Sequence, residues 1–125
     1  MNIPKNLLYT KSHEWVLLED DKAKVGLTEH ATEQLGDLVF VNLPEVDDEV
    51  EAEEALGEVE SVKAVSDVYS PVTGKVCAIN EEVVDDPAKV NADAYDSWLV
   101  EISDITAKRE LLSPEDYEKL LAEEE

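Results

Sequence analysis

Cysteine is nearly absent from this sequence: Cys77 is the only one among 125 residues. A single cysteine excludes an intramolecular disulfide and is compatible with a reducing compartment. Together with only two histidines, it gives poor support for a zinc site built from tetrahedral nitrogen and sulfur ligands. Cys77 lies in a strand-like run, so we expect its thiol to be buried in the core as a small hydrophobe.

Glycine is also scarce, and its distribution bears on enzymatic function. The four glycines are scattered along the chain, so no glycine-rich loop could cradle a phosphate group. No serine or cysteine lies in a recognisable nucleophile elbow. Counting residues leaves a Cys–His or Ser–His nucleophile open, and carboxylates are too abundant for any pair of them to indicate acid–base catalysis. The sequence thus gives no positive signal of an enzyme.

Basic residues are few: ten Lys and Arg stand against 32 Asp and Glu, which gives a formal net charge of −22. Such a charge disfavours binding to nucleic acid and to anionic lipid, because both need cationic side chains. It keeps a protein soluble, and it also steers a protein toward basic patches on partners. Solubility or thermal adaptation remains the simpler explanation for the acidity.

Long apolar runs are absent from the sequence as well. No stretch reaches the length of a membrane-spanning helix, and residues 1–5 lack the regions of a signal peptide. We therefore expect a cytoplasmic protein that does not bind membranes. Because 43% of the residues are hydrophobic, we expect residues 1–125 to form one domain with a genuine core.

Short apolar segments separated by turn residues dominate the chain, a pattern typical of a small, mostly-β barrel or sandwich. Thr28 and Gly36 are placed to begin and end a short helix, and another helical turn is expected from residue 86 to residue 91. Ser113 and Pro114 predict the start of a C-terminal helix over about residues 113–124. The expected strands lie within residues 9–27, 37–42, 50–52, 55–62, 65–69, 75–79 and 98–102.

Lys63 stands out because lysines are rare and because it lies between two strand-like segments. We expect it at the exposed tip of a hairpin over about residues 59–69. The acidic surroundings favour its ammonium form, which makes it a poor Schiff-base nucleophile but suits a lysine that a modifying enzyme converts to an amide. Composition alone favours an ordinary solvated lysine. The segment also lacks the Gly, Asn and Pro that mark turns.

Five ordered motifs resemble those of glycine cleavage H proteins. The segment Glu60-Ser61-Val62-Lys63-Ala64, followed by Ser66-Asp67 and by residues 70–74, resembles the family's lipoylation segment. The similarity continues through residues 12–15, 26–31, 35–44 and 90–98, in order and over nearly the whole chain.

The resemblance implies a fold and a function. The fold is a barrel-sandwich hybrid, lipoyl-domain-like, with a C-terminal helix. The function is that of a non-catalytic, monomeric carrier, with lipoate attached to Lys63 as an amide. The carrier shuttles an aminomethyl group and reducing equivalents between glycine decarboxylase (P protein), aminomethyltransferase (T protein) and dihydrolipoyl dehydrogenase (L protein). A lipoate ligase or lipoyl transferase would modify it.

The same resemblance assigns roles to individual residues. Those assigned to recognition by the lipoylating enzyme are Glu60, Ser61, Val62 and Ala64. A cleft near Ser12, Glu14 and Asp67 would receive the loaded arm, with Thr28 and His30 at its edge. Glu14 and Asp67 are the expected charge partners of the arm's ammonium group. For His13 we favour a structural role at a helix end or core edge.

The sequence departs from the family pattern where glycine is usual. Asp47 and Glu53 each replace a glycine, and the segment 95–98 is shortened and lacks its glycine. These changes bear on loop geometry and partner docking. Separately, the alternatives to an H protein are an H-like paralogue that relays lipoate or serves another lipoyl-dependent system, an unmodified interaction module, and an enzyme. A lipoyl or biotin domain of another enzyme is disfavoured, since such domains have other residues beside the lysine and lie in longer chains with linkers.

Overall fold

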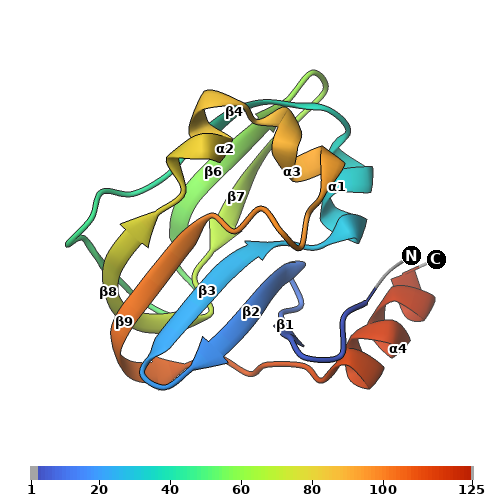
Figure 1. Ribbon diagram of the computed structural model, residues 1–125. Coiled ribbons are helices and arrows are strands. Elements are labelled where there is room, and N and C mark those ends of the chain that lie inside the picture. Colours follow the sequence, from blue (N-terminus) through green and yellow to red (C-terminus); the bar gives the residue numbers. More distant parts are fainter. Residues whose placement is uncertain (1–2, 125) are drawn as a thin grey trace.

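Two antiparallel sheets face each other in the computed structural model, which describes residues 3–124. The larger sheet contains, in spatial order, β1 (Leu8–Tyr9), β2 (Glu14–Glu19), β3 (Lys22–Leu27), β9 (Val100–Lys108), β8 (Val72–Ile79) and β5 (Glu49–Val50). The smaller sheet contains β4 (Leu38–Asn42), β6 (Ala55–Ser61) and β7 (Val65–Tyr69). Figure 1 shows the smaller sheet behind the long strands β3 and β9. The expected mostly-β fold is confirmed.

The main core fills the space between the two sheets. Strand side chains alternate between the two faces of a sheet, so every second apolar residue points inward. Val25 and Ile102 from the larger sheet and Val59 from the smaller sheet are fully buried. Each such side chain stabilises the fold by about 1.5–3 kcal/mol relative to an exposed position.

Two helices follow their sequence signals closely. α1 (Glu29–Leu35) begins after Thr28, whose side chain accepts a hydrogen bond from the amide of Ala31, and ends at Gly36 with a φ of 83°. α4 (Pro114–Glu124) begins after Ser113, whose Oγ accepts a hydrogen bond of 3.1 Å from the amide of Asp116. Both predictions are confirmed because the capping residues carry the information locally.

The helices between β8 and β9 were predicted less completely. α3 (Ala88–Ala92) agrees with the expected helical turn. α2 (Glu81–Asp85) was missed, although the side chain of Asn80 caps it by accepting a hydrogen bond from the amide of Glu82. Asn is a strong N-cap residue, so this signal was available in the sequence.

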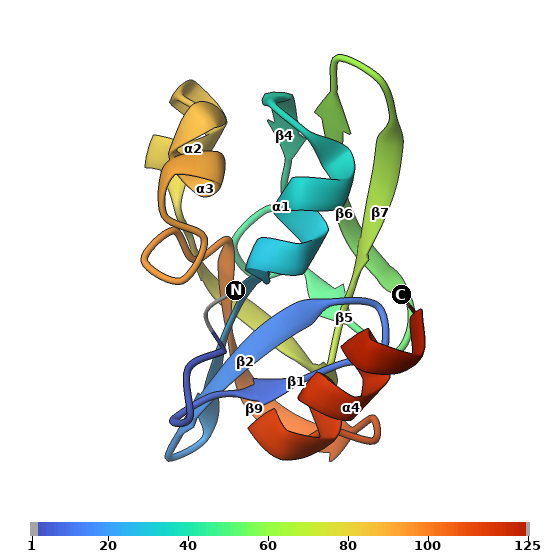
Figure 2. The ribbon, with the colours of Figure 1, turned by 90° about the vertical axis from the view of Figure 1, so that its right-hand side faces the viewer.

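A second apolar cluster lies beneath α4. The rings of Tyr9 and Tyr117 stack at a centroid distance of 4.6 Å, and burial raises the pKa of both phenols. Trp15 is buried beside them. Trp98 is only partly buried, and Lys24 Nζ lies 5.4 Å from its ring centroid, a cation–π contact. Figure 2 shows α4 packed against β1 and β2 at the end of the molecule opposite the β6–β7 hairpin.

The prediction that Cys77 belongs to the core is wrong. The cysteine is partly exposed, and its thiol donates a hydrogen bond of 3.4 Å to the carbonyl oxygen of Glu101. Val76 beside it is fully buried, so the alternation along β8 turns Cys77 to the opposite face.

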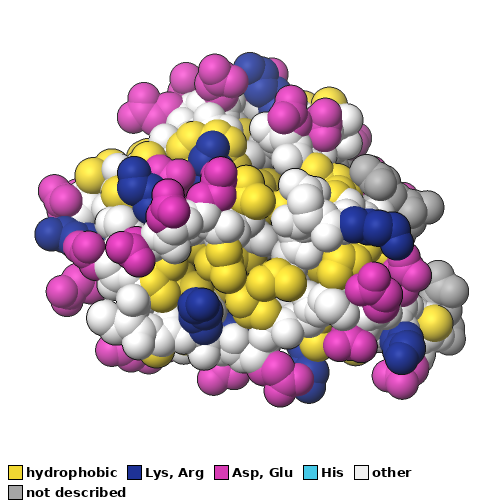
Figure 3. Space-filling model, turned by 60° about the horizontal axis from the view of Figure 1, so that its bottom comes forward, with side chains coloured by type: hydrophobic (Ala, Val, Ile, Leu, Met, Phe, Trp, Pro, Cys, Tyr) yellow, Lys and Arg dark blue, Asp and Glu magenta, His cyan; other side chains and the backbone are white. Residues whose placement is uncertain are grey.

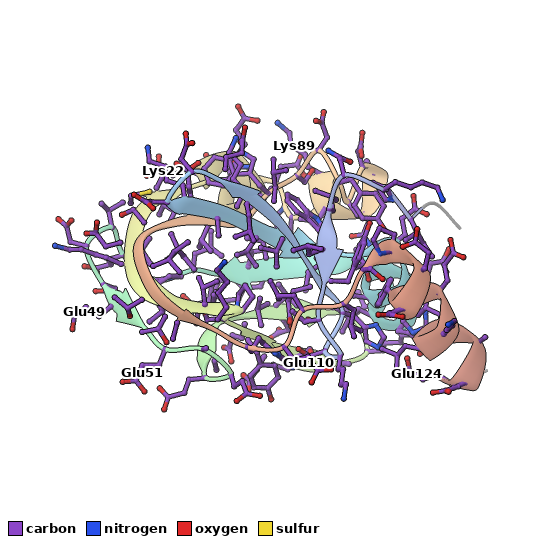
Figure 4. The ribbon with its side chains drawn as sticks, turned by 90° about the horizontal axis from the view of Figure 1, so that it is seen from below. Lys22, Glu49, Glu51, Lys89, Glu110 and Glu124 are labelled. Carbon is purple, nitrogen blue, oxygen red and sulfur yellow. The ribbon has the colours of Figure 1, made fainter. Side chains whose placement is uncertain are left out.

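Acidic side chains are spread over the surface. In Figure 3 they are distributed around the outline of one face, with hydrophobic side chains nearer its middle. The side chains labelled in Figure 4, among them Glu49, Glu51 and Lys89, point outward. Within residues 3–124, none of the helices is both long and apolar enough to span a membrane.

The two positions where glycine is usual in the family have left-handed backbone conformations. The φ angle is 80° at Asp47 and 73° at Glu53. Asp tolerates this region better than Glu, whose longer side chain cannot bond its own backbone as easily. The amide of Glu53 donates to the carbonyl of Ser70 at 2.8 Å, which helps to hold the strained residue in place.

We expect Glu53→Gly to raise the free energy of unfolding by about 0.5 kcal/mol. Relief of the left-handed strain outweighs the extra entropy of glycine in the unfolded chain. Urea denaturation followed by tryptophan fluorescence measures the change. As a control, Glu54→Gly removes a neighbouring acidic residue without a positive φ, and it should lower the free energy of unfolding. A Glu53→Gly protein that is as destabilised as Glu54→Gly would contradict the prediction.

Candidate functional site

Lys63 lies at the tip of the hairpin that joins β6 to β7. The strands pair up to Glu60 and Val65, and residues 61–64 form the turn. The amide of Ser61 donates to the carbonyl of Ala64 at 2.7 Å, and Ser61 Oγ accepts from the amides of Lys63 at 3.2 Å and Ala64 at 3.0 Å. A serine hydroxyl therefore closes a turn that has no Gly, Asn or Pro.

The tip is exposed, whereas its base is buried. Val59 and Val68, one on each strand, are at most 1% exposed and anchor the hairpin in the core. Val62 at the tip is 77% exposed, and Lys63 beside it is exposed as well. The hairpin thus presents its lysine to solvent from a fixed base. Figure 2 shows the turn between β6 and β7 at the top of the molecule.

The stem of Lys63 extends toward the end of α1. A Cβ added at Gly36 would lie 3.5 Å from Lys63 Cε. Asn91 holds this corner from behind: its Oδ1 accepts from the amide of Leu38 at 2.9 Å, and its Nδ2 donates to the carbonyl of Gly36 at 2.8 Å. Asn91 had no assigned role in the sequence, because both of its partners are more than fifty residues away.

A cavity of about 280 Å³ lies beside the hairpin, between α1 and β7. Three of the five residues predicted for the arm cleft line it: Ser12, His30 and Asp67. Leu35 and Gln34 of α1 form part of the wall, so this helix contributes both apolar and polar side chains to the cavity. The structure therefore brings residues from three separate segments to one cavity close to Lys63.

Glu14 lies behind this cavity rather than at its surface. It is 1% exposed, and its Oε1 accepts hydrogen bonds from Thr10 Oγ1 at 2.5 Å and Ser12 Oγ at 2.6 Å. Its Oε2 accepts from the amide of Tyr69 at 3.3 Å, and Arg109 Nη1 lies 3.8 Å from Oε1. The carboxylate is thus paired and hydrogen-bonded, as a buried charge requires. Arg109 could not be paired with Glu14 from the sequence.

Thr28 is also buried, at the end of a chain of polar contacts. Its Oγ1 lies 2.7 Å from Tyr117 Oη, which lies 2.9 Å from His13 Nδ1. His13 Nε2 in turn lies 3.3 Å from a carboxylate oxygen of Glu124. Burial lowers the pKa of His13, and neighbouring His30 lowers it further, while Glu124 opposes both. His13 therefore joins α4 to the core edge, in agreement with its expected structural role.

Fold and site together define a class of protein. Two small facing sheets that present one lysine at the tip of an anchored hairpin have the lipoyl-domain-like architecture of a carrier domain.

Comparisons with known proteins identify the particular family. The family model for the glycine cleavage H-protein matches residues 7–124. A glycine cleavage system H protein of Lachnoclostridium phytofermentans is 55% identical over 99% of this chain and 98% of its own length. Another, from Rubrobacter xylanophilus, is 52% identical over 98% of each chain. The crystal structure of an H protein from Mycobacterium marinum superimposes with a TM-score of 0.92 at 42% identity, covering 96% of this chain and 99% of that one. The chain belongs to the glycine cleavage H-protein family.

Removal of the Ser61 hydroxyl should loosen the tip of the hairpin. We expect Ser61→Ala to lower the free energy of unfolding by about 1 kcal/mol, because two amides lose their shared acceptor. Amide hydrogen exchange at residues 62–64 should accelerate. The control is Ser66→Ala, since Ser66 Oγ makes only an exposed contact of 3.4 Å to the carbonyl of Asp67. Equal exchange at the tip in both variants would show that Ser61 does not hold the turn.

Proposed function

We propose that this chain is the lipoyl carrier of a glycine cleavage system and that Lys63 bears lipoate as an amide. The observation that carries the proposal is the geometry of Lys63: an exposed lysine at the tip of a hairpin whose base is buried. A modifying enzyme can enclose such a tip without unfolding the sheet. Because Lys63 is exposed to solvent, its amine is accessible to that enzyme.

The residues around Lys63 suit recognition by a lipoate ligase or lipoyl transferase. Val62 and Ala64 flank the lysine and are exposed, as is Glu60 on the strand below. Ser61 acts indirectly, because its side chain is turned inward to close the turn. In this proposal Ser61 sets the shape of the tip, and the lipoylating enzyme contacts Glu60, Val62 and Ala64 directly.

When bound, the lipoyl group supplies a disulfide that can accept both an aminomethyl group and two electrons. The protein's own part is to position the arm and to protect its cargo. The cavity between α1 and β7 begins near the Lys63 stem, so an arm attached there can fold into it. The chain carries out no reaction in this scheme and serves as a carrier subunit.

The cleft residues would hold the ammonium group of the loaded arm. Asp67 lies in the cavity wall and is exposed, which makes it the charge partner that the arm can reach. Ser12 and His30 offer further polar contacts from the same wall. Glu14 acts through Ser12, whose hydroxyl it holds at 2.6 Å, and Thr28 acts through Tyr117.

The partners in this proposal are those of the glycine cleavage reaction. A monomeric carrier would receive the aminomethyl group at glycine decarboxylase, deliver it to aminomethyltransferase and be reoxidised by dihydrolipoyl dehydrogenase. An attached flexible arm raises the local concentration of the intermediate at each docked partner, so the cargo need not be released. The net charge of −22 favours encounters with basic surfaces on these enzymes.

Lipoylation is tested by mass spectrometry of the protein incubated with lipoate ligase, ATP and lipoate. We expect a gain of one lipoyl group, located on Lys63 by peptide mapping and absent in Lys63→Arg. Lys75→Arg is the matched control, because Lys75 is another exposed lysine and lies in a weak ion pair with Asp47. An unmodified Lys63, under conditions that lipoylate a known carrier, would refute the proposal.

The role of Asp67 is tested on the lipoylated and aminomethylated protein. We expect Asp67→Asn to release ammonia and formaldehyde several-fold faster than the parent, since the arm loses its ionic partner in the cleft. Asp85→Asn makes the same change in net charge at an exposed site on α2, and it should leave the release rate unchanged. Identical release rates in the two variants would exclude Asp67 as the partner of the arm.

A further inference from the structure

Both histidines of the chain meet Glu124 at the edge of the cavity beside α1. His13 precedes β2, His30 lies in α1, and Glu124 lies in the last turn of α4, where Figure 4 labels it. One nitrogen from each imidazole and one carboxylate oxygen all lie within 4.8 Å of one another. The two rings are 4.5 Å apart between centroids, and His13 Nε2 lies 3.3 Å from Glu124 Oε2. Three segments that are far apart in the sequence thus bring nitrogen and oxygen atoms close together.

The His13 ring is held as a metal-binding imidazole is held. Its Nδ1 bonds Tyr117 Oη at 2.9 Å, and Tyr117 is fixed in turn by Thr28, so Nε2 is directed toward Glu124. In metal sites the second ring nitrogen of a histidine ligand almost always donates to a hydrogen-bond acceptor, which fixes the tautomer and the ring orientation. The Tyr117 hydroxyl oxygen can act as that acceptor here. His13 also has a φ of 70°, an uncommon conformation outside glycine that must be held by its surroundings.

The chemistry of the three groups agrees with this arrangement. Neutral imidazole and ionised carboxylate are the forms that bind metal ions. A net charge of −22 further raises the local concentration of cations around the protein.

We propose that His13, His30 and Glu124 bind a divalent transition-metal ion, with zinc the expected occupant. Two imidazoles and a carboxylate form a three-ligand zinc set, which leaves the fourth position to water in the cavity. Zinc–ligand distances of about 2.0–2.1 Å require ligand atoms about 3.3 Å apart. The pair His13–Glu124 already has this spacing, and His30 offers a ring nitrogen within 4.8 Å of both.

A bound ion would connect α4 to α1 and to the segment before β2. The site uses one wall of the cavity assigned to the lipoyl arm, but its three ligands require neither Lys63 nor lipoate. The sequence alone does not indicate such a site. Two histidines and one of 32 acidic residues carry no spacing that identifies them as ligands.

The test is a zinc titration of the full-length, tag-free chain carrying Lys63→Arg, so that no lipoyl thiol can bind the ion. Nitrogen-detected NMR of the imidazoles reads the site directly, because the chain has two histidines only. We expect both rings to shift together and to saturate at one equivalent. Calorimetry under the same conditions gives the affinity.

Three variants make the assignment specific. We expect His30→Asn and Glu124→Gln each to weaken zinc binding at least about tenfold, as the loss of a ligand requires, and Tyr117→Phe to weaken it by about tenfold through the orientation of His13. Glu123→Gln is the matched control: it removes the neighbouring exposed carboxylate of α4 and should leave the affinity unchanged. Circular dichroism confirms that each variant is folded.

Two outcomes would overturn the proposal. One is the absence of imidazole shifts at a several-fold excess of zinc, which would mean that any heat measured comes from surface carboxylates. The other is an affinity that Glu124→Gln and Glu123→Gln reduce equally. Neither outcome bears on Lys63, so failure of the metal site and failure of lipoylation are separate results.

Discussion

The buried carboxylate of Glu14 connects the parts of this protein on which its site depends. It lies on β2 of the larger sheet, accepts from the amide of Tyr69 at the end of β7 in the smaller sheet, and lies 3.8 Å from Arg109 beyond β9. A charge that is 1% exposed is costly unless it is fully hydrogen-bonded, so these contacts fix one another. The cavity between α1 and β7 lies in front of this network, and its shape follows from it.

The hairpin that carries Lys63 combines a rigid base with an accessible tip. Val59 and Val68 fix the base in the core, while the Ser61 hydroxyl shapes the turn without a residue that is typical of turns. A lysine on a long flexible loop would be equally exposed, but its position relative to the cavity would vary. Here the stem lies beside Gly36, the residue after Leu35 of the cavity wall.

Much of the fold was predictable because its signals are local. Thr28 and Ser113 start their helices through contacts with residues three positions ahead, and these signals are readable in the sequence. The family motif around Lys63 is also contiguous. The prediction for Cys77 was wrong because an apolar run does not reveal which face of a strand each residue occupies. Glu53 stands where glycine is usual in the family, and its φ of 73° shows why glycine suits that position.

The sequence by itself determined the mostly-β architecture, the capped helices and the lysine at the hairpin tip, since periodicity, caps and contiguous motifs act over a few residues. Only the tertiary structure decided which polar residues meet. It places Ser12, His30 and Asp67 around one cavity. Glu14 is buried behind that cavity, where it pairs with Arg109. It also brought the two imidazoles beside the end of α4. Contacts between residues tens of positions apart depend on how the sheets and helices pack, and no local pattern encodes that packing.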